Sequence, residues 1–341
     1  MEKHIHTLFN EEILASACSK YNMDRGSVKK VGGFENYVYG YTINNKEYVL
    51  RLTHSSHRSK NMVQGELDWV EYLSKNHSAV CMPVYSKNHQ LVEIIPIAED
   101  NYFIATSFEK AEGRHIQAKD ANDSLFCTWG KVIGKMHQLT KSYKPKNTAT
   151  TRPAWYEEKL FSNCREYLPE GHEIVADKLE KMIHKLKSLP QDKDGYGLIH
   201  TDIHSGNFFI NKGDITVFDF DDCSYMYFIS DIAIALFYCL LRPDTPENRL
   251  AFANRFLKAF LDGYREENKL DDFWIQLLPD FLKLRELLLY VVVYRSCDIN
   301  NPGPWEENYM RNRRESIEND IPFIGLEWDL SPFMNLSAST L

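Results

Sequence analysis

The sequence lacks a long hydrophobic run, a close pair of cysteines and an excess of positive charge. Its most apolar run, Leu287 to Tyr294, is too short to span a bilayer, and we interpret it as a buried helix. The seven cysteines include no pair at C-x-x-C spacing, so a zinc ribbon or a thioredoxin-like motif is not expected. A net charge of −8 gives no support for general nucleic-acid binding or for attraction to an anionic membrane.

The cysteine pattern and the first residues indicate the cellular compartment. An odd number of cysteines scattered through apolar segments is typical of free thiols in a reducing environment. The first six residues lack the apolar core of a signal peptide, and we therefore expect a cytoplasmic protein. With 341 residues and 43% hydrophobic content, the chain can bury one large core or two smaller ones. Nothing in the composition indicates an oligomeric state.

One segment, residues 198–222, carries most of the recognisable chemistry. An apolar lead-in ends at His200-x-Asp202, Asn207 follows five residues after Asp202, and a second apolar run delivers Asp219. This is the order and spacing of a kinase catalytic loop and its metal-binding aspartate. Phosphoryl transfer needs a carboxylate near the acceptor hydroxyl, and a carboxamide and a second carboxylate on magnesium. The turn at Lys212-Gly213 predicts a hairpin between the two parts of the segment.

These motifs resemble those of the aminoglycoside phosphotransferase and choline kinase-like family, the small-molecule branch of the protein-kinase fold. Members typically carry His-Gly-Asp-x-x-x-x-Asn followed by Ile-Asp-Phe or Ile-Asp-Trp, and here Thr201 replaces the glycine. The resemblance implies that Asp202 is the catalytic aspartate, that Asn207 and Asp219 bind magnesium, and that ATP and Mg²⁺ are the cofactors. It implies that His200 is structural and that Asp231 braces the catalytic loop.

The pattern of elements agrees with an α+β, protein-kinase-like two-lobe fold. We expect a small N-terminal antiparallel sheet with one helix in residues 1–110, the nucleotide-binding lobe. We expect a large, mainly helical lobe in residues 111–341, which would hold the catalytic and acceptor-binding sites. Five strands are predicted within 31–41, which holds two strands around a glycine turn, and in 47–52, 91–96 and 102–108.

Helices are predicted from apolar periodicity and from their end signals. In the first part these are residues 10–21 and the helix that Ser59 would cap, with the apolar stripe Val63, Leu67, Val70 and Leu73. In the second part they are 125–139, 155–186, and helices starting at Ser230, at Thr245-Pro246 and at Pro279. Gly130 and Gly134 would allow close packing of a second helix. Residues from Pro302 onward are expected to be irregular.

Several residues of the first part are candidates for nucleotide binding. Gly32, Gly33 and Asn36 occupy the place of the loop that covers the nucleotide, although neither G-x-G-x-x-G nor a Walker A sequence is present. Arg51 stands where kinases place the lysine of the third strand, and its fork could bridge phosphate and carboxylate. Glu66 is the favoured partner of Arg51, with Asp68 and Glu71 as alternatives.

The hinge between the lobes is expected at Ser107, Phe108 and Glu109, where adenine would meet main-chain groups. Such contacts have no side-chain signature, so this prediction depends on position alone.

Three other functions compete with a small-molecule kinase. A metallohydrolase could use His200, Asp202 and His204, whose alternation would point them one way along a strand. A non-catalytic nucleotide-binding interaction protein would need no intact Asp202. A Ser/Thr-type protein kinase is less favoured, because the short stretch from Asp219 to Asp231 leaves no room for a long activation loop.

The acceptor is predicted to be a hydroxylated small molecule, and its identity is left open, as is the choice between ATP and GTP. An amine-bearing acceptor is favoured if acidic side chains line its site, because opposite charge raises its local concentration. The candidate acids are Glu157, Glu158, Asp221, Asp222, Glu306 and Glu307.

Overall fold

A computed structural model describes residues 3–242 and 245–334 of the chain. It divides into two compact units. The first unit runs from the N-terminus to Gly113 and includes residues 143–152 and 216–221. The second unit holds residues 114–142 and 153–215 and the chain from Asp222 onward. The roles assigned to residues 1–110 and 111–341 stay predictions.

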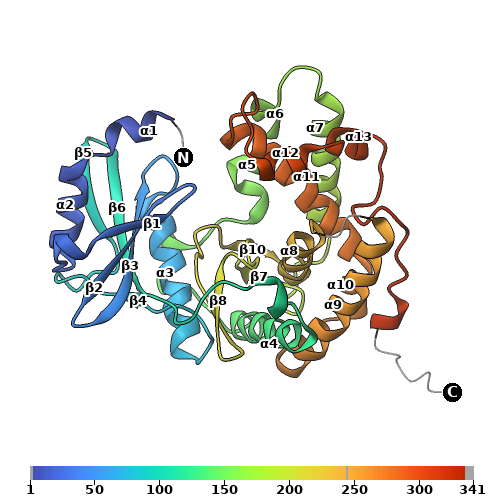
Figure 1. The fold of residues 1–341 in the computed structure, drawn as a ribbon, viewed down its shortest axis with the longest axis horizontal. Coiled ribbons are helices and arrows are strands. Elements are labelled where there is room, and N and C mark those ends of the chain that lie inside the picture. The colour runs from blue at the N-terminus through green and yellow to red at the C-terminus, as the bar shows by residue number, and fades with distance from the viewer. Residues whose placement is uncertain (1–2, 243–244, 335–341) are drawn as a thin grey trace. The chain divides into compact units, whose positions relative to one another are not determined.

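The first unit is a sheet with helices (Figure 1). All strand pairs are antiparallel, in the order β1-β2-β3-β6-β4, with β5 also paired to β6. This confirms the predicted type of sheet and adds β4, which at two residues is too short for a pattern to reveal. The elements are α1 (Lys3–Leu8), α2 (Glu11–Lys20), β1 (Lys29–Gly32), β2 (Tyr37–Ile43), β3 (Lys46–His54), α3 (Lys60–Lys75), β4 (Pro83–Val84), β5 (Glu93–Ala98) and β6 (Asn101–Glu109).

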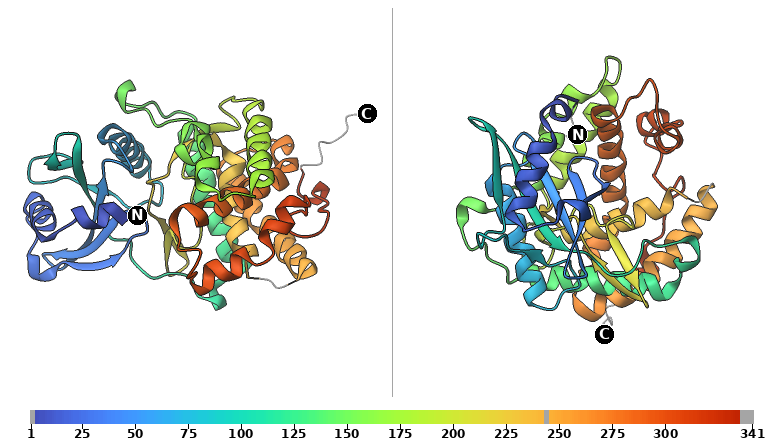
Figure 2. Two further views of the ribbon diagram at one scale, coloured as in Figure 1. Left: turned by 90° about the horizontal axis from the view of Figure 1, so that it is seen from above. Right: turned by 60° about the vertical axis from the view of Figure 1, so that its left-hand side comes forward.

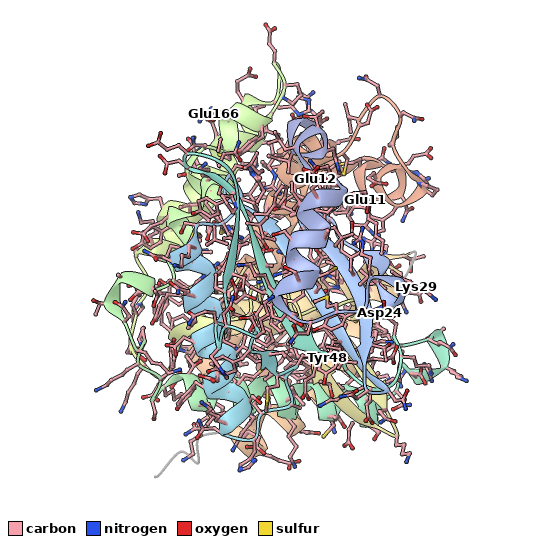
Figure 3. The ribbon with its side chains drawn as sticks, turned by 90° about the vertical axis from the view of Figure 1, so that its left-hand side faces the viewer. Glu11, Glu12, Asp24, Lys29, Tyr48 and Glu166 are labelled. Atoms are coloured by element: carbon pink, nitrogen blue, oxygen red, sulfur yellow. The ribbon has the colours of Figure 1, made fainter. Side chains whose placement is uncertain are left out.

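The two helices predicted in the first unit are confirmed with their end signals. The side chain of Asn10 caps α2, and Glu11 and Glu12 in the first turn complement the positive end of the helix (Figure 3). Ser59 caps α3 by accepting a hydrogen bond from the backbone of Met62 at 3.2 Å. The four residues of the predicted stripe of α3 are buried.

The alternation of β3 separates two kinds of environment. Leu50 and Leu52 are fully buried in an apolar cluster with residues of α2. Because successive side chains of a strand point to opposite faces, Arg51 points to the other face, where α3 supplies its partner. One strand therefore contributes both to the core of the first unit and to a buried charged site.

The second unit is mainly helical, and its helix α11 packs against α7 and α8 (Figure 1, Figure 2). Its helices are α4 (Asp123–Thr140), α5 (Lys159–Ser162), α6 (Cys164–Tyr167), α7 (Glu173–Lys187), α8 (Phe228–Leu240), α9 (Pro246–Glu267), α10 (Asp272–Gln276), α11 (Leu278–Ser296), α12 (Pro304–Met310) and α13 (Arg313–Glu318). Strands β7 (Tyr196–Ile199) and β10 (Ser224–Tyr227) pair antiparallel. The predicted hairpin is confirmed as β8 (Phe208–Asn211) and β9 (Asp214–Val217).

Gly130 explains how tightly α4 and α9 pack. A Cβ atom at Gly130 would lie 1.9 Å from the carbonyl oxygen of Phe260, so no other residue fits without moving a backbone. Gly134 faces the carbonyl oxygen of Tyr264 in the same way, at 2.6 Å. The predicted close packing at this glycine pair is confirmed.

Three predictions about helices in the second unit are wrong. Ser230 does not cap α8, because the chain turns directly from β10 into the helix at Phe228. The region 155–186 is broken into short pieces before α7, with Pro169 and Gly171 in the gap. The region after Pro302 contains α12 and α13. The first of these begins with Pro304 and two acids in its first turn, an ordinary helix start.

The described part of the chain contains neither a membrane-spanning helix nor a disulfide. Within residues 3–242 and 245–334, no helix combines the length and apolar character that crossing a bilayer requires. All seven cysteines lie in this part of the chain and are free thiols, four of them buried. The run 287–294 is part of the buried helix α11, as expected.

Candidate active site

Arg51 and Glu66 form a buried, two-pronged ion pair in the first unit. The guanidinium donates to the two carboxylate oxygens at 2.8 and 2.6 Å, and the residues are 4% and 0% exposed. Burial lowers the pKa of Arg51, but the charges of Glu66, Asp221 and Asp219 outweigh it and raise that pKa above its usual value. The predicted pairing is confirmed, and the arginine is held as a fixed positive charge.

The two alternative partners of Arg51 have other roles. The carboxylate of Asp68 accepts hydrogen bonds from the hydroxyl of Tyr143 and the backbone of Lys146, each at 2.9 Å. Glu71 accepts from Tyr85 and from the Lys146 ammonium. Both acids thus tie α3 to neighbouring segments of the first unit.

Asp221 is the second buried acid of this site. Its carboxylate lies 2.6 Å from Nε2 of His57, 3.7 Å from Nε of Arg58 and 3.8 Å from Nη1 of Arg51. Arg152 donates to its carbonyl oxygen at 2.9 Å. Burial raises the pKa of Asp221, but His57 and the arginines outweigh it and hold that pKa well below its usual range.

Asp219 lies two residues before Asp221 in the same unit. Its charge is one of those that raise the pKa of Arg51. Its backbone has a φ of 66°, in the left-handed region that aspartate tolerates better than most residues. This conformation re-aims the carboxylate relative to the preceding strand.

The first unit has buried polar atoms that fit a bound nucleotide and cation. In the described part of the chain, Nε of Arg51, Oδ1 of Asp221 and Oδ1 of Asn36 are buried and have no hydrogen-bond partner. Buried polar groups are nearly always paired, so such atoms call for a ligand or water. A donor on a guanidinium suits a phosphate oxygen, and carboxylate and amide oxygens suit a hard cation.

Of the two glycines at the end of β1 and directly after it, only one is required by geometry. Gly33 has a φ of 119°, and a Cβ atom there would lie 1.9 Å from the carbonyl oxygen of Asn36. Nothing lies within 4 Å of a Cβ built on Gly32. The tight turn of the candidate phosphate loop therefore depends on Gly33, and the nucleotide contacts of Gly32, Gly33 and Asn36 stay predictions.

The predicted hinge residues lie at the end of β6. Ser107 and Phe108 pair with β3 on one side and with β4 on the other, and the amide of Glu109 donates to the carbonyl of Met82 at 2.9 Å. The Phe108 ring packs under the Arg51 guanidinium at 5.3 Å. Contact of these three residues with adenine stays a prediction.

The catalytic loop in the second unit is braced from below by Asp231. The Asp231 carboxylate accepts hydrogen bonds from the backbone amides of His200 and Thr201 at 3.1 and 2.8 Å, and it lies 3.2 Å from His137. His200 is fully buried, and its Nδ1 accepts from the amide of Asp202 at 3.3 Å. The structural roles expected of His200 and Asp231 are confirmed.

Thr201 adopts a conformation that suits the glycine it replaces. Its φ is 62°, which is unfavourable for a β-branched residue. Its hydroxyl donates to the carbonyl oxygen of Asp222 at 2.6 Å, and its amide donates to Asp231. These two hydrogen bonds offset part of the strain, so the loop keeps its shape without glycine.

Asp202 is held by several side chains at once. The Asn207 amide nitrogen donates to its Oδ2 at 3.0 Å, and Nη2 of Arg285 donates to its Oδ1. Nε2 of His204 lies 3.4 Å from Oδ2. Burial raises the pKa of Asp202, but the charges of Arg285 and His204 outweigh it and hold that pKa well below its usual range. The carboxylate is thus ionised and fixed in orientation.

The orientation of Asn207 suits its predicted role. Because its amide nitrogen donates to Asp202, its amide oxygen is the atom left for a hard cation. The binding of metal by Asn207 and Asp219 nevertheless stays a prediction.

Arg285, on α11, is the residue of this site that sequence reasoning missed. It donates to the hydroxyl of Tyr238 at 2.6 Å as well as to Asp202, and its guanidinium lies over the Tyr238 ring. Its Nε is buried and has no hydrogen-bond partner in the described residues. No local motif could have revealed it, because it stands 83 residues from Asp202.

The cluster proposed for a metallohydrolase is not arranged as a metal site. His200 uses its Nδ1 to accept from the amide of Asp202, and the His204 ring is tilted against Tyr238 with ring centroids 4.5 Å apart. Over the part of the chain that the structure describes, no group of three or more His, Cys, Asp or Glu side chains could hold a metal ion.

A kinase-type catalytic loop, a buried strand-three cation paired with a helix glutamate, and a two-unit α+β fold together define a phosphotransferase of protein-kinase-like fold. Residues 28–270 match the phosphotransferase enzyme family, and the chain belongs to that family. The predicted family, fold class and type of enzyme are confirmed: the chain is a small-molecule kinase.

Three similar proteins refine this placement. Amicoumacin kinase of Bacillus subtilis (strain 168) is 37% identical over 330 residues, which cover 96% of this chain and 98% of that protein. A solved structure of amicoumacin kinase hAmiN in complex with AMP-PNP, Ca²⁺ and Ami has a TM-score of 0.91 at 36% identity, covering 98% of this chain and all of the other. A microcompartment-associated aminopropanol kinase has a TM-score of 0.74 at 21% identity, covering 93% and 99%, which shows a shared fold.

The predicted cofactors agree with this placement. The enzyme uses ATP and a divalent cation, as the complex of its relative with AMP-PNP and Ca²⁺ indicates and as the unpartnered polar atoms of the first unit allow.

Proposed function

We propose that the enzyme transfers the γ-phosphoryl group of ATP to a hydroxyl of amicoumacin or of a closely related amine-bearing compound. The observation that carries this acceptor is identity of 37% along almost the whole of both chains, because such similarity includes the helices of the second unit. No sequence motif defines the acceptor site.

In this proposal Asp202 serves the acceptor. Its carboxylate accepts a hydrogen bond from the acceptor hydroxyl, and the hydroxyl oxygen then attacks the γ-phosphorus as the bond to ADP breaks and a proton is released. Because its pKa is held low, Asp202 is a weak base and contributes mainly by orienting the hydroxyl. Arg285 and Asn207 hold the carboxylate in the required direction.

Asn207 and Asp219 are proposed to hold magnesium, and Arg51 and the Gly33 loop to hold the phosphates. When bound, the cation neutralises charge on the phosphates. Arg51 is supported in this role by its pairing with Glu66 and by its unpartnered Nε. Glu66 acts through Arg51 and does not itself contact the nucleotide.

Two of the acids that favoured an amine-bearing acceptor have other partners. Asp221 is occupied by His57 and arginines in the first unit, and Glu157 accepts a hydrogen bond from the backbone of Ala154. Asp222 remains a candidate acid near the acceptor, since its charge acts on Arg285 and Tyr238. The proposed acceptor therefore follows from the named relative rather than from an acidic wall.

The site of action is proposed to be the cytoplasm, where ATP is supplied and seven free thiols stay reduced. A small-molecule acceptor is the only partner proposed.

The test is an acceptor screen with ATP and magnesium. Amicoumacin, simpler amino alcohols, aminoglycosides and neutral sugars would be offered to the wild type, with ADP release and product mass as readouts. We expect amicoumacin to gain one phosphoryl group. Phosphorylation of a neutral sugar in preference to every amine would overturn the proposed acceptor class.

A further inference from the structure

His57 lies in the turn between β3 and α3, and each of its ring nitrogens meets a carboxylate. Nδ1 is 2.9 Å from Oε2 of Glu35, and Nε2 is 2.6 Å from Oδ2 of Asp221. A neutral imidazole has only one N–H, so only the doubly protonated imidazolium can donate to both carboxylates at these distances. In that form the ring links the two acids.

The two acids belong to segments that matter for nucleotide binding. Glu35 is part of the loop between β1 and β2, and Asp221 follows Asp219 by two residues. All three residues lie in the first unit. His57 thus joins the candidate phosphate loop to the segment that carries the candidate metal ligand.

The contact of His57 with Glu35 matters more for the loop than the contact of His57 with Asp221 matters for Asp221. Between Gly33 and Asn36 the chain belongs to no strand, and Phe34 at its tip is 56% exposed. Asp221 is already neutralised by Arg58 and Arg51 and has Arg152 on its carbonyl. The distinctive contribution of His57 is therefore its contact with Glu35.

We propose that His57 is a positioning residue for phosphoryl transfer, because its imidazolium ties Glu35 to Asp221 and so fixes the loop 33–36 that receives the nucleotide phosphates. This inference rests on the proposed nucleotide role of that loop. Holding the loop in its binding conformation before ATP arrives removes an ordering cost that binding would otherwise bear.

The link predicts specific effects of its loss. Without it, the backbone amides of residues 33–36 should open more often, and ATP should bind more weakly. Loss of a hydrogen bond to a charged group changes such an equilibrium constant roughly tenfold. The affinity for the acceptor should stay unchanged, since neither Glu35 nor His57 belongs to the second unit.

The experiment compares His57→Asn, Glu35→Gln, their double variant and the control His89→Asn. His89 is exposed, lies in the first unit and already has a left-handed φ that asparagine accepts. Hydrogen exchange of residues 33–36 and of α9 is measured without ligand, together with ATP affinity in magnesium and the KM values for ATP and acceptor.

We expect roughly tenfold faster exchange confined to the loop and roughly tenfold weaker ATP binding in each single variant. The double variant should be no worse than either single one, because the residues act as one link. His89→Asn should behave as the wild type. If His57→Asn does not fold, Glu35→Gln carries the test, since it keeps the shape of a partly exposed side chain.

Unchanged loop exchange or unchanged ATP affinity in the foldable single variants would overturn the proposal, and so would additive losses in the double variant. These readouts require no acceptor. Failure of the wild type to phosphorylate amicoumacin while it still binds ATP would count against the acceptor proposal alone.

Discussion

The candidate residues of the first unit and those of the second unit are held in place by different means. In the first unit, Arg51, Glu66 and Asp221 come from a strand, a helix and a later segment, and buried charges hold them. In the second unit, Asp202 and Asn207 lie in one short loop, which backbone hydrogen bonds to Asp231 support. The first arrangement depends on charge balance across distant segments, whereas the second depends mainly on local backbone geometry, with Arg285 of α11 as a distant contact.

This difference explains which perturbations each part tolerates. Removing one charge from the first part leaves another charge buried without its partner, which is costly. Removing a side chain that acts on the acceptor leaves the braced loop in place, so catalysis should fall without loss of structure.

Asp202→Asn should reduce kcat by roughly 10²- to 10⁴-fold, because the carboxylate that orients the acceptor hydroxyl is lost. The substitution keeps the shape of the side chain but removes the charge that Arg285 contacts, so the melting temperature should fall, although by less than in Arg51→Met, where the pair is more buried. Steady-state kinetics with amicoumacin and calorimetric melting give the two values. Turnover near that of the wild type would remove Asp202 from the mechanism.

Arg51→Met should lower the free energy of unfolding by about 3–5 kcal/mol, because Glu66 is left charged and fully buried. Arg51→Met combined with Glu66→Met should recover most of that loss, since two apolar side chains need no partner. Urea unfolding followed by fluorescence measures both. A double variant no more stable than the single one would show that the ion pair is not the source of the effect.

The stabilising effect of His57 should depend on pH. Burial lowers its pKa, but Asp221 and Glu35 outweigh burial and raise it to about 9 from an unfolded value of about 6.5. The stabilisation is therefore complete below about pH 6.5, declines as pH rises, and is lost above about pH 9, with an upper limit of about 3 kcal/mol.

The check is the difference in unfolding free energy between wild type and His57→Asn, measured from pH 6 to about pH 9.5. The difference should shrink steadily over this range. A constant difference would mean that His57 stabilises the first unit through packing alone.

Thr201→Gly should be more stable than Thr201→Ala by about 1 kcal/mol. Both variants lose the hydroxyl bond to Asp222, but only glycine relieves the left-handed φ of 62°. The greater entropy of an unfolded glycine offsets part of that gain. Denaturant unfolding of the pair isolates the strain, and equal stabilities would mean that Thr201 is not strained.

The contrast between the two parts also sets what the sequence could reveal. The catalytic loop, its hairpin and Asp231 lie within 34 residues, from Leu198 to Asp231. Spacing predicted the loop and the hairpin, and the family resemblance implied the role of Asp231. The Arg51–Glu66 pair followed from the order of strand and helix. His57 and Arg285 carry no local pattern, because their partners lie 164 and 83 residues away.

Each error in the predicted helices has a specific structural cause. Ser230 has the chemistry of a helix cap, but β10 leads straight into α8, and the backbone of Phe228 donates to Gly195 instead. The start of α12 at Pro304 carried the usual signals and was passed over because aromatic residues surround it. In the first case the neighbouring strand decided the boundary, whereas in the second the local signals at Pro304 did.

The most direct test of the account is ATP titration, with and without magnesium, of Asp202→Asn, Asp219→Ala and the control Asp214→Ala. Asp214 is exposed at the start of β9, close in sequence to Asp219. We predict that Asp202→Asn and Asp214→Ala keep the full magnesium-dependent gain in ATP affinity and that Asp219→Ala loses it. An unchanged gain in Asp219→Ala, or its loss in Asp202→Asn, would contradict the assignment of one aspartate to the nucleotide and the other to the acceptor.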